Sequence, residues 1–151
     1  MPYTPAPASS NITSAAPTGT TSATAVMMGI AGSITPLVTG RIFLIASGTM
    51  KNDTTADGVT IDLRYGTGSA PSNGNAVTGT LVGIAQTFTA LTGSLTNAFS
   101  IQGIITGLAV PGVNSLGATG STTAVWLDLT ALKISAGTAS VANVSISAFE
   151  F

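Results

Sequence analysis

Hydrophobic and polar residues alternate along several segments of the chain. In 59–65 (VTIDLRY), apolar residues stand at every second position, with Thr60, Asp62 and Arg64 between them. A period of two places the apolar set on one face of a β-strand and the polar set on the face toward water. The segment 41–47 has two mostly apolar faces, which predicts a strand covered on both sides, in the centre of a sheet or at a subunit interface.

Eight segments carry strand patterns, and none shows the 3.6-residue period of a helix. The expected strands are 23–30, 33–38, 41–47, 59–65, 81–90, 98–106, 123–134 and 141–151. Turn-forming residues separate them, and Pro36 removes a backbone donor from the second one. The pattern predicts an all-β chain folded as an antiparallel β-sandwich, jelly-roll-like, with about eight strands.

The first 22 residues differ from the rest in composition. Four of the seven prolines fall here, among Ser, Thr and Ala. Such a segment forms neither a helix nor a central strand, and its polyproline-like character favours an extended arm that lies along a partner. We therefore divide the chain into an N-terminal arm, 1–22, and a β-sandwich domain, 23–151. The candidate partner-contacting residues of the arm are Pro2, Tyr3, Pro5, Pro7 and Pro17.

The tryptophan and two of the methionines outside the arm can each be interpreted in two ways. Trp126 alternates with the apolar face of 123–134, so it is either shielded by a neighbouring loop or placed at an interface, and we include it among the candidate partner contacts. Met27 and Met28 could form a soft binding surface, but core filling is the commoner use of methionine.

Charged residues make up 6% of the chain, against about 25% in a typical soluble domain. A free monomer ordinarily keeps a mixed, charged surface. We therefore expect much of this surface to lie against other subunits. The formal net charge of −1 gives no basic patch for nucleic acid. The sequence has no apolar run of about 18 residues, so we expect no membrane insertion, and we find no secretory signal pattern.

The chain contains neither His nor Cys, so the commonest catalytic bases and nucleophiles are missing and we expect no enzyme and no cofactor. Asp62 and Asp128 could form a glycosidase-type carboxylate pair. The alternative, which we favour, is that each marks the solvent face of its strand. Asn52, Asp53 and Asp57 offer hard oxygen ligands for Ca²⁺, although their spacing departs from the EF-hand loop and such residues also form ordinary turns.

Three stretches carry a resemblance to known proteins. They are GIAGSITPLVTGRIFLIASGTMKNDTTADGVTIDLRYGTG (29–68), WLDL (126–129) and GTASVANVSISAFEF (137–151). Together they resemble small virion proteins of tailed bacteriophages, of the jelly-roll type used as capsid decoration or cement proteins and as fibre-tip domains. None of the three stretches is a catalytic motif.

The resemblance implies a bacteriophage virion structural protein, assembled in the host cytoplasm. The first expectation is a capsid decoration protein, a homotrimer whose body and arm bind the major capsid protein or other virion proteins. The alternative is a tail-fibre or receptor-binding tip that contacts the host surface through the loops 66–80 and 108–122, since long loops are often functional.

Overall fold

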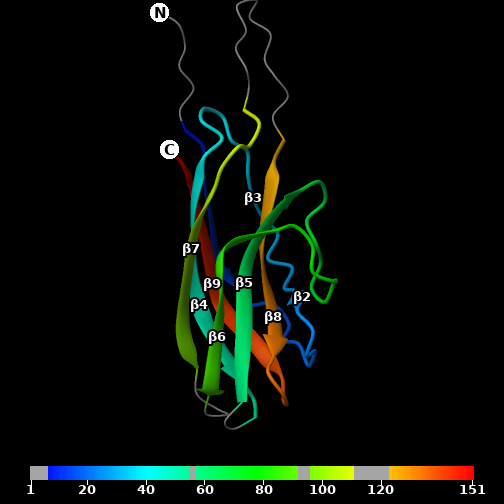
Figure 1. The fold of residues 1–151 in the computed structure, drawn as a ribbon. Coiled ribbons are helices and arrows are strands. Elements are labelled where there is room, and N and C mark those ends of the chain that lie inside the picture. Colours follow the sequence, from blue (N-terminus) through cyan, green and yellow to red (C-terminus); the bar gives the residue numbers. More distant parts are fainter. Residues whose placement is uncertain (1–6, 55–56, 92–95, 111–122) are drawn as a thin grey trace, which may run out of the picture.

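The computed structural model describes residues 7–54, 57–91, 96–110 and 123–151, in which every regular element is a β-strand (Figure 1). In chain order the strands are β1 (Ser9–Ala15), β2 (Val26–Met27), β3 (Gly32–Ile34), β4 (Ile42–Asn52), β5 (Asp57–Thr67), β6 (Thr80–Leu91), β7 (Asn97–Ile105), β8 (Val125–Lys133) and β9 (Ala139–Glu150). Within these ranges, no helix is long and apolar enough to cross a membrane.

Backbone hydrogen bonds join the strands into two antiparallel sheets. One has the order β1-β9-β4-β7, and the other has the order β2-β8-β5-β6, with β3 also paired to β8. Because β5 occupies one edge of β8, β2 and β3 share its other edge and act as one interrupted strand. Counted this way, the strand positions run 1-8-3-6 in one sheet and 2-7-4-5 in the other. This is the order of a jelly roll, and it confirms the predicted β-sandwich.

The core lies between the two sheets and consists of the alternate residues that the sequence pattern predicts. Ile42 and Leu44 of β4 and Val59, Ile61 and Leu63 of β5 are completely buried. Met28 belongs to this core, which confirms core filling for it, whereas Met27 is also completely buried but lies outside the core cluster. Burying a side chain of this size contributes about 1.5–3 kcal/mol, so the paired inner faces supply most of the drive for folding.

β4 lies in the centre of its sheet, as its two apolar faces predict. It pairs with β7 on one side and with β9 on the other. Its inner face is buried, whereas Phe43 and Ile45 on its outer face are only half-buried. The sequence predicts that this outer face is covered. In the described residues, however, its apolar surface remains accessible.

The sandwich begins earlier than the sequence analysis expects. Ser9–Ala15 belongs to the predicted arm, but it forms β1 and pairs antiparallel with β9. Ile12 on this strand packs against the core. The boundary after Ser22 is therefore corrected: the sheet includes β1. The segment was missed because its sequence, SSNITSA, is almost wholly polar, and β9 supplies its hydrogen-bonding partners.

The next two strands are shorter than predicted. The expected strand 23–30 is reduced to β2, and the expected strand 33–38 to β3, which ends at Ile34. Pro36 lies beyond this end, as a residue without a backbone donor should. The backbone after β2 binds Asp128 and the 73–75 turn, and the backbone after β3 binds Glu150, so neither segment extends the sheet.

The chain itself covers part of the outer face of the β8–β5 sheet. The N–H of Met27 donates to Asn75 O at 2.9 Å, and the N–H of Gly74 donates to Met27 O at 2.9 Å. The indole of Trp126 is 5% exposed and its N–H donates to Thr67 O at 3.2 Å. Of the two readings of Trp126, the structure therefore shows the one in which a neighbouring loop shields it.

Gly79 makes this cover possible, and we predict that Gly79→Ala opens it. Gly79 has φ +74, and an added Cβ would overlap the ring of Trp126 and the carbonyl oxygen of Tyr65. Gly107 is a matched control, with the same φ of +74 and nothing within 4 Å of its Cβ position. Gly79→Ala should cost about 1–3 kcal/mol more than Gly107→Ala, because only the first adds overpacking to the backbone penalty.

The measurement is urea unfolding together with fluorescence. Trp126 is the single tryptophan of the chain, so its emission reports directly on the cover. We expect a red shift in Gly79→Ala and none in Gly107→Ala. Equal stability and equal emission in the two variants would contradict this account.

Candidate functional site

The predicted carboxylate pair lies on one face of the β5–β8 ladder. Register places Asp62 opposite Thr130 and Arg64 opposite Asp128. Asp62 forms an ion pair with Arg64, with 3.2 Å between the carboxylate oxygen and the guanidinium nitrogen. Their side chains are 13% and 18% exposed. The prediction that this face lies in water is therefore wrong here, because the loop that carries Gly79 accepts a hydrogen bond from Arg64 and covers it.

Asp128 is completely buried, which corrects the expectation that it faces solvent. Its carboxylate accepts the N–H groups of Gly29 at 2.9 Å, Ile30 at 2.8 Å and Leu129 at 2.8 Å. Burial raises its pKa, and the three hydrogen bonds oppose that rise. Both oxygens of Asp128 thus bind backbone amides that hold the segment after β2 against β8.

The predicted calcium loop uses its oxygens in the same manner. Asn52 is completely buried, and its amide donates to Gly58 O and Ala136 O at 3.0 Å each. Asp57 accepts the N–H groups of Gly58 and of Ser135 and Ala136. These hydrogen bonds tie the β4–β5 turn to the β8–β9 turn.

The remaining residue of this loop, Asp53, accepts the N–H of Thr138 at 2.6 Å. Hydrogen bonds from backbone amides hold the pKa of Asp53 and the pKa of Asp57 below their usual range. In the described residues, no group of three or more acidic side chains is arranged to hold a metal ion. The structure therefore favours the turn reading of these residues.

Glu150 closes the opposite end of the sandwich. Its carboxylate accepts five backbone N–H groups at 2.7–3.0 Å, those of Ala8, Leu37, Val38, Thr39 and Gly40. Glu150 is 6% exposed, and these hydrogen bonds outweigh the effect of desolvation and lower its pKa to about 2. The sequence predicts no role for Glu150, because the backbone amides that form an anion-binding nest around its carboxylate come from residues distant in sequence.

The arm residues are only partly within the described chain. Pro7 is exposed and Pro17 is half-buried. Pro2, Tyr3 and Pro5 lie outside the described residues. The role of these residues as partner contacts therefore stays a prediction.

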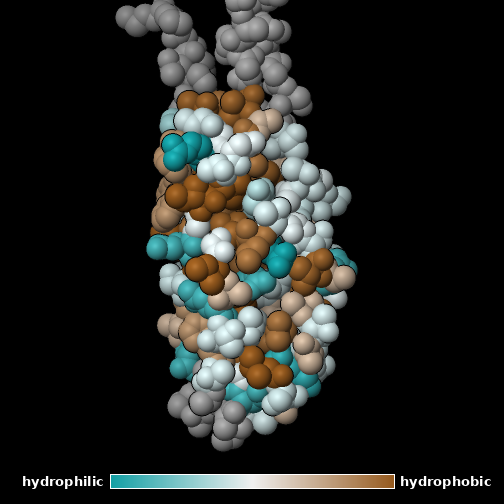
Figure 2. Space-filling view, viewed as in Figure 1, coloured by the Kyte–Doolittle hydropathy of each residue, from teal (hydrophilic) through white to brown (hydrophobic). Residues whose placement is uncertain are grey.

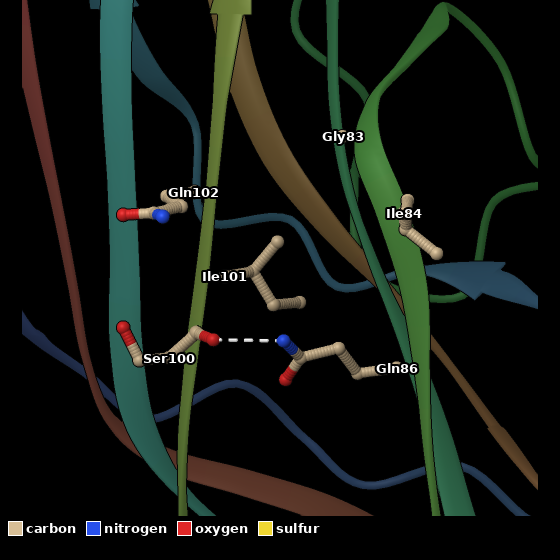
Figure 3. A pocket seen from close by; sticks show the side chains of 6 residues that line it. All are labelled: Gly83, Ile84, Gln86, Ser100, Ile101 and Gln102. Atoms are coloured by element: carbon tan, nitrogen blue, oxygen red, sulfur yellow. Dashed lines mark hydrogen bonds between the residues drawn. The ribbon is translucent and has the colours of Figure 1, made fainter.

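β6 and β7 face each other along one long edge of the sandwich, where a hollow of about 490 Å³ opens (Figure 3). Gln86 reaches across it and donates to Ser100 O at 2.9 Å, and Ile101 lies between the two strands. The lining residues are Gly83, Ile84, Gln86, Ser100, Ile101 and Gln102. None of these side chains is charged, so this hollow offers amide and apolar contacts.

A second hollow lies on the outer face of the β1-β9-β4-β7 sheet, and we call it the aromatic hollow. Its lining residues are Phe43, Ile104, Phe149 and Phe151. Ile104 is 53% exposed, and Phe149 and Phe151 are 47% exposed each. Single exposed apolar residues are common, but contiguous apolar patches on a monomer are often functional. The sequence carried two signals for it: the second apolar face of 41–47, and Phe149 among the serines of 141–151.

Apart from Ile45, the rest of this sheet face carries mostly small or polar residues and is almost uncharged. Along β9 and β7 its residues are Asn143, Ser145, Ser147, Ala98, Ser100 and Gln102. Arg41 and Lys51 stand at the two ends of β4, both exposed. Figure 2 shows the same character over the side of the molecule that it displays, with much pale surface, separate brown areas and little strong teal.

Comparison with solved structures finds the same fold in a virus. The structure of the infectious bursal disease virus Gt strain aligns with a TM-score of 0.50 and 15% identity over 95% of this chain. The Gx strain of the same virus aligns with a TM-score of 0.48 and 16% identity over 97% of this chain. The chain spans 33% of the length of each of these structures' chains, and neither comes from a tailed bacteriophage. No protein family matches the sequence, and neither does any curated protein sequence.

The nest around Glu150 gives a stability prediction. In Glu150→Gln, one end of the side chain becomes an NH₂ group, which would face N–H donors such as those of Ala8 and Leu37. We expect a loss of about 2 kcal/mol in the free energy of unfolding, the cost of leaving buried donors unpaired. Thermal and urea unfolding at pH 7 measure it, and a variant as stable as the native chain would contradict the proposed role.

The same carboxylate gives a pH dependence. Its pKa falls from 4.5 in the unfolded chain to about 2 in the folded one, so its contribution to stability is present above pH 4.5 and is lost as pH falls toward 2. Across this pH window, the free energy of unfolding should fall more steeply with decreasing pH for the native chain than for Glu150→Gln. Parallel pH profiles would show that Glu150 has an ordinary pKa.

Proposed function

We propose that this chain is a virion structural protein that acts as a capsid decoration or cement protein. The observation that carries the proposal is the outer face of the β1-β9-β4-β7 sheet, which the described residues leave accessible and which is almost uncharged and apolar at one end. The jelly-roll strand order supports it, since the fold is shared with a virus structure. The resemblance of 29–68 and 137–151 to small virion proteins of tailed bacteriophages supports the phage assignment.

In this proposal the sheet face seats the body on the shell. A four-stranded sheet with strands of about nine residues presents roughly 30 Å by 19 Å, by ordinary strand dimensions. That area of about 570 Å² is about 70% of the roughly 800 Å² per partner that a specific protein–protein interface typically buries. Burying Ser, Asn and Gln side chains costs little free energy when they form hydrogen bonds with the partner. Burying charged side chains would cost much more. The partner is the major capsid protein, and the site of action is the virion, assembled in the host cytoplasm.

The N-terminal residues reach from the body to neighbouring subunits, and we propose a homotrimer as the unit that binds. Because β1 belongs to the sheet, the free part of the arm is shorter than residues 1–22 and ends before Ala8, whose N–H binds Glu150. The chain has no catalytic role in this proposal.

Charge placed on the sheet face should abolish binding to the shell. The variant Ser100→Glu/Gln102→Glu adds two carboxylates to exposed positions of β7, and Ser69→Glu/Thr78→Glu adds the same charge to the exposed loop before β6. Co-sedimentation with shells of the major capsid protein of the same virus should show at least a tenfold loss of occupancy for the first variant. The second variant should bind as the native chain does.

Two outcomes would count against the decoration proposal. Full occupancy by the β7 variant would show that the sheet face is not part of the interface. No shell binding by the native chain would show that it is not a decoration protein. The receptor-binding alternative predicts instead that particles lacking this chain fail to adsorb to host cells. It has less structural support, because part of the loop 66–80 is used to cover Trp126.

A further inference from the structure

The aromatic hollow has the form of a site for one extended segment. Register places Phe43 of β4 directly opposite Ile104 of β7 and opposite Phe149 of β9, so the three side chains form a row across three strands. Phe151 follows Phe149 by two residues and completes the lining, which contains no polar residue. The row crosses the strands, and Ile104 and Phe149 in it are about half exposed. It therefore presents an apolar surface that runs across the strands.

Hydrogen-bond donors stand at the margin of this hollow. Arg41 precedes Phe43 by two residues, and Gln102 precedes Ile104 by two, so each projects from the same face as the hollow residue that follows it. Both side chains are exposed, and the Arg41 guanidinium lies 4.6 Å from the centroid of the Phe151 ring. An apolar surface with donors beside it suits a ligand that carries apolar rings and free carbonyl acceptors.

The first residues of the chain have that chemistry. Residues 2–5 read Pro-Tyr-Thr-Pro, and Pro7 follows. Two prolines three residues apart fall on one side of a polyproline II helix, which has three residues per turn. Such a helix has no internal hydrogen bonds, so its carbonyls remain free to accept them, and its proline rings dock on aromatic surfaces in other recognition systems.

We propose that residues 2–5 of one copy bind in the aromatic hollow of a second copy. The direction of β1 argues for a second copy as the host. β1 runs antiparallel to β9 with Ser9 opposite Phe149, so the chain before Ser9 leaves the sheet in the direction in which β9 ends. The N–H of Ala8 donates to Glu150 at 3.0 Å, so the sheet holds the chain from this residue onward.

Reach is sufficient for this contact. Six residues in a polyproline II conformation extend about 19 Å at roughly 3.1 Å per residue. To enter its own hollow, the segment would have to reverse direction within a proline-rich stretch. The inference rests on the proposed function for its role in lacing subunits on a shell, but the contact itself can be measured in the purified chain.

The experiment measures self-association of the full-length chain by sedimentation equilibrium with three variants. Pro2→Ala/Pro5→Ala changes the segment, Ile104→Ser/Phe149→Ser changes the hollow, and Ile84→Ser removes an isoleucine that is 81% exposed on β6 and points away from Ile101. We expect the first two variants to raise the dissociation constant at least tenfold. Ile84→Ser should leave it unchanged, and unfolding curves establish that each variant is folded.

Mixing identifies the second copy. The segment variant keeps an intact hollow and the hollow variant keeps an intact segment, so an equimolar mixture should form a mixed complex that neither variant forms alone. A monomeric native chain would overturn the proposal, as would native-like association of Pro2→Ala/Pro5→Ala, which would show that the hollow binds a second copy without the segment. Failure of shell binding leaves these readouts unaffected, so the two proposals fail separately.

Discussion

Buried carboxylates that gather backbone amides hold the loops of this jelly roll in place. Asp57, Asp128 and Glu150 are all at most 6% exposed, and each accepts N–H groups from a segment distant in sequence. They fix the β8–β9 turn, the segment after β2 and the β3–β4 connection. Charge-assisted hydrogen bonds of this kind are stronger than neutral ones. Three of the five acidic residues are thus buried, which helps to explain why the surface carries so little charge.

The two sheets differ in what covers their outer faces. On the β8–β5 sheet, the chain folds back on itself through the hydrogen bonds between Met27 and the 74–75 turn, and Trp126 and Asp128 are buried beneath. On the β1-β9-β4-β7 sheet, the half-exposed aromatic hollow and small polar residues remain accessible. An apolar row that stays in water loses the stabilisation that burial would give it. This asymmetry supports the proposal that the second face, and not the first, contacts other subunits.

Sequence reasoning failed where polar residues are buried by segments far away along the chain. β1 was read as part of an arm because its residues are Ser, Asn and Thr, although pairing with β9 satisfies its backbone. Asp128 was assigned to solvent because it alternates with apolar residues, and alternation reports only that it faces away from the core. The nest around Glu150 has no local signature, since its donors come from residues 8 and 37–40.

The sequence by itself determined the all-β class, the bodies of most strands and the low charge of the chain. These depend on local periodicity and composition, which each strand carries in its own residues. The tertiary structure decided which polar faces are covered, where the carboxylates find their donors, and that Phe43, Ile104, Phe149 and Phe151 meet in one hollow. Those features depend on register between strands and on loops folding over sheets, which are long-range contacts that no single segment specifies.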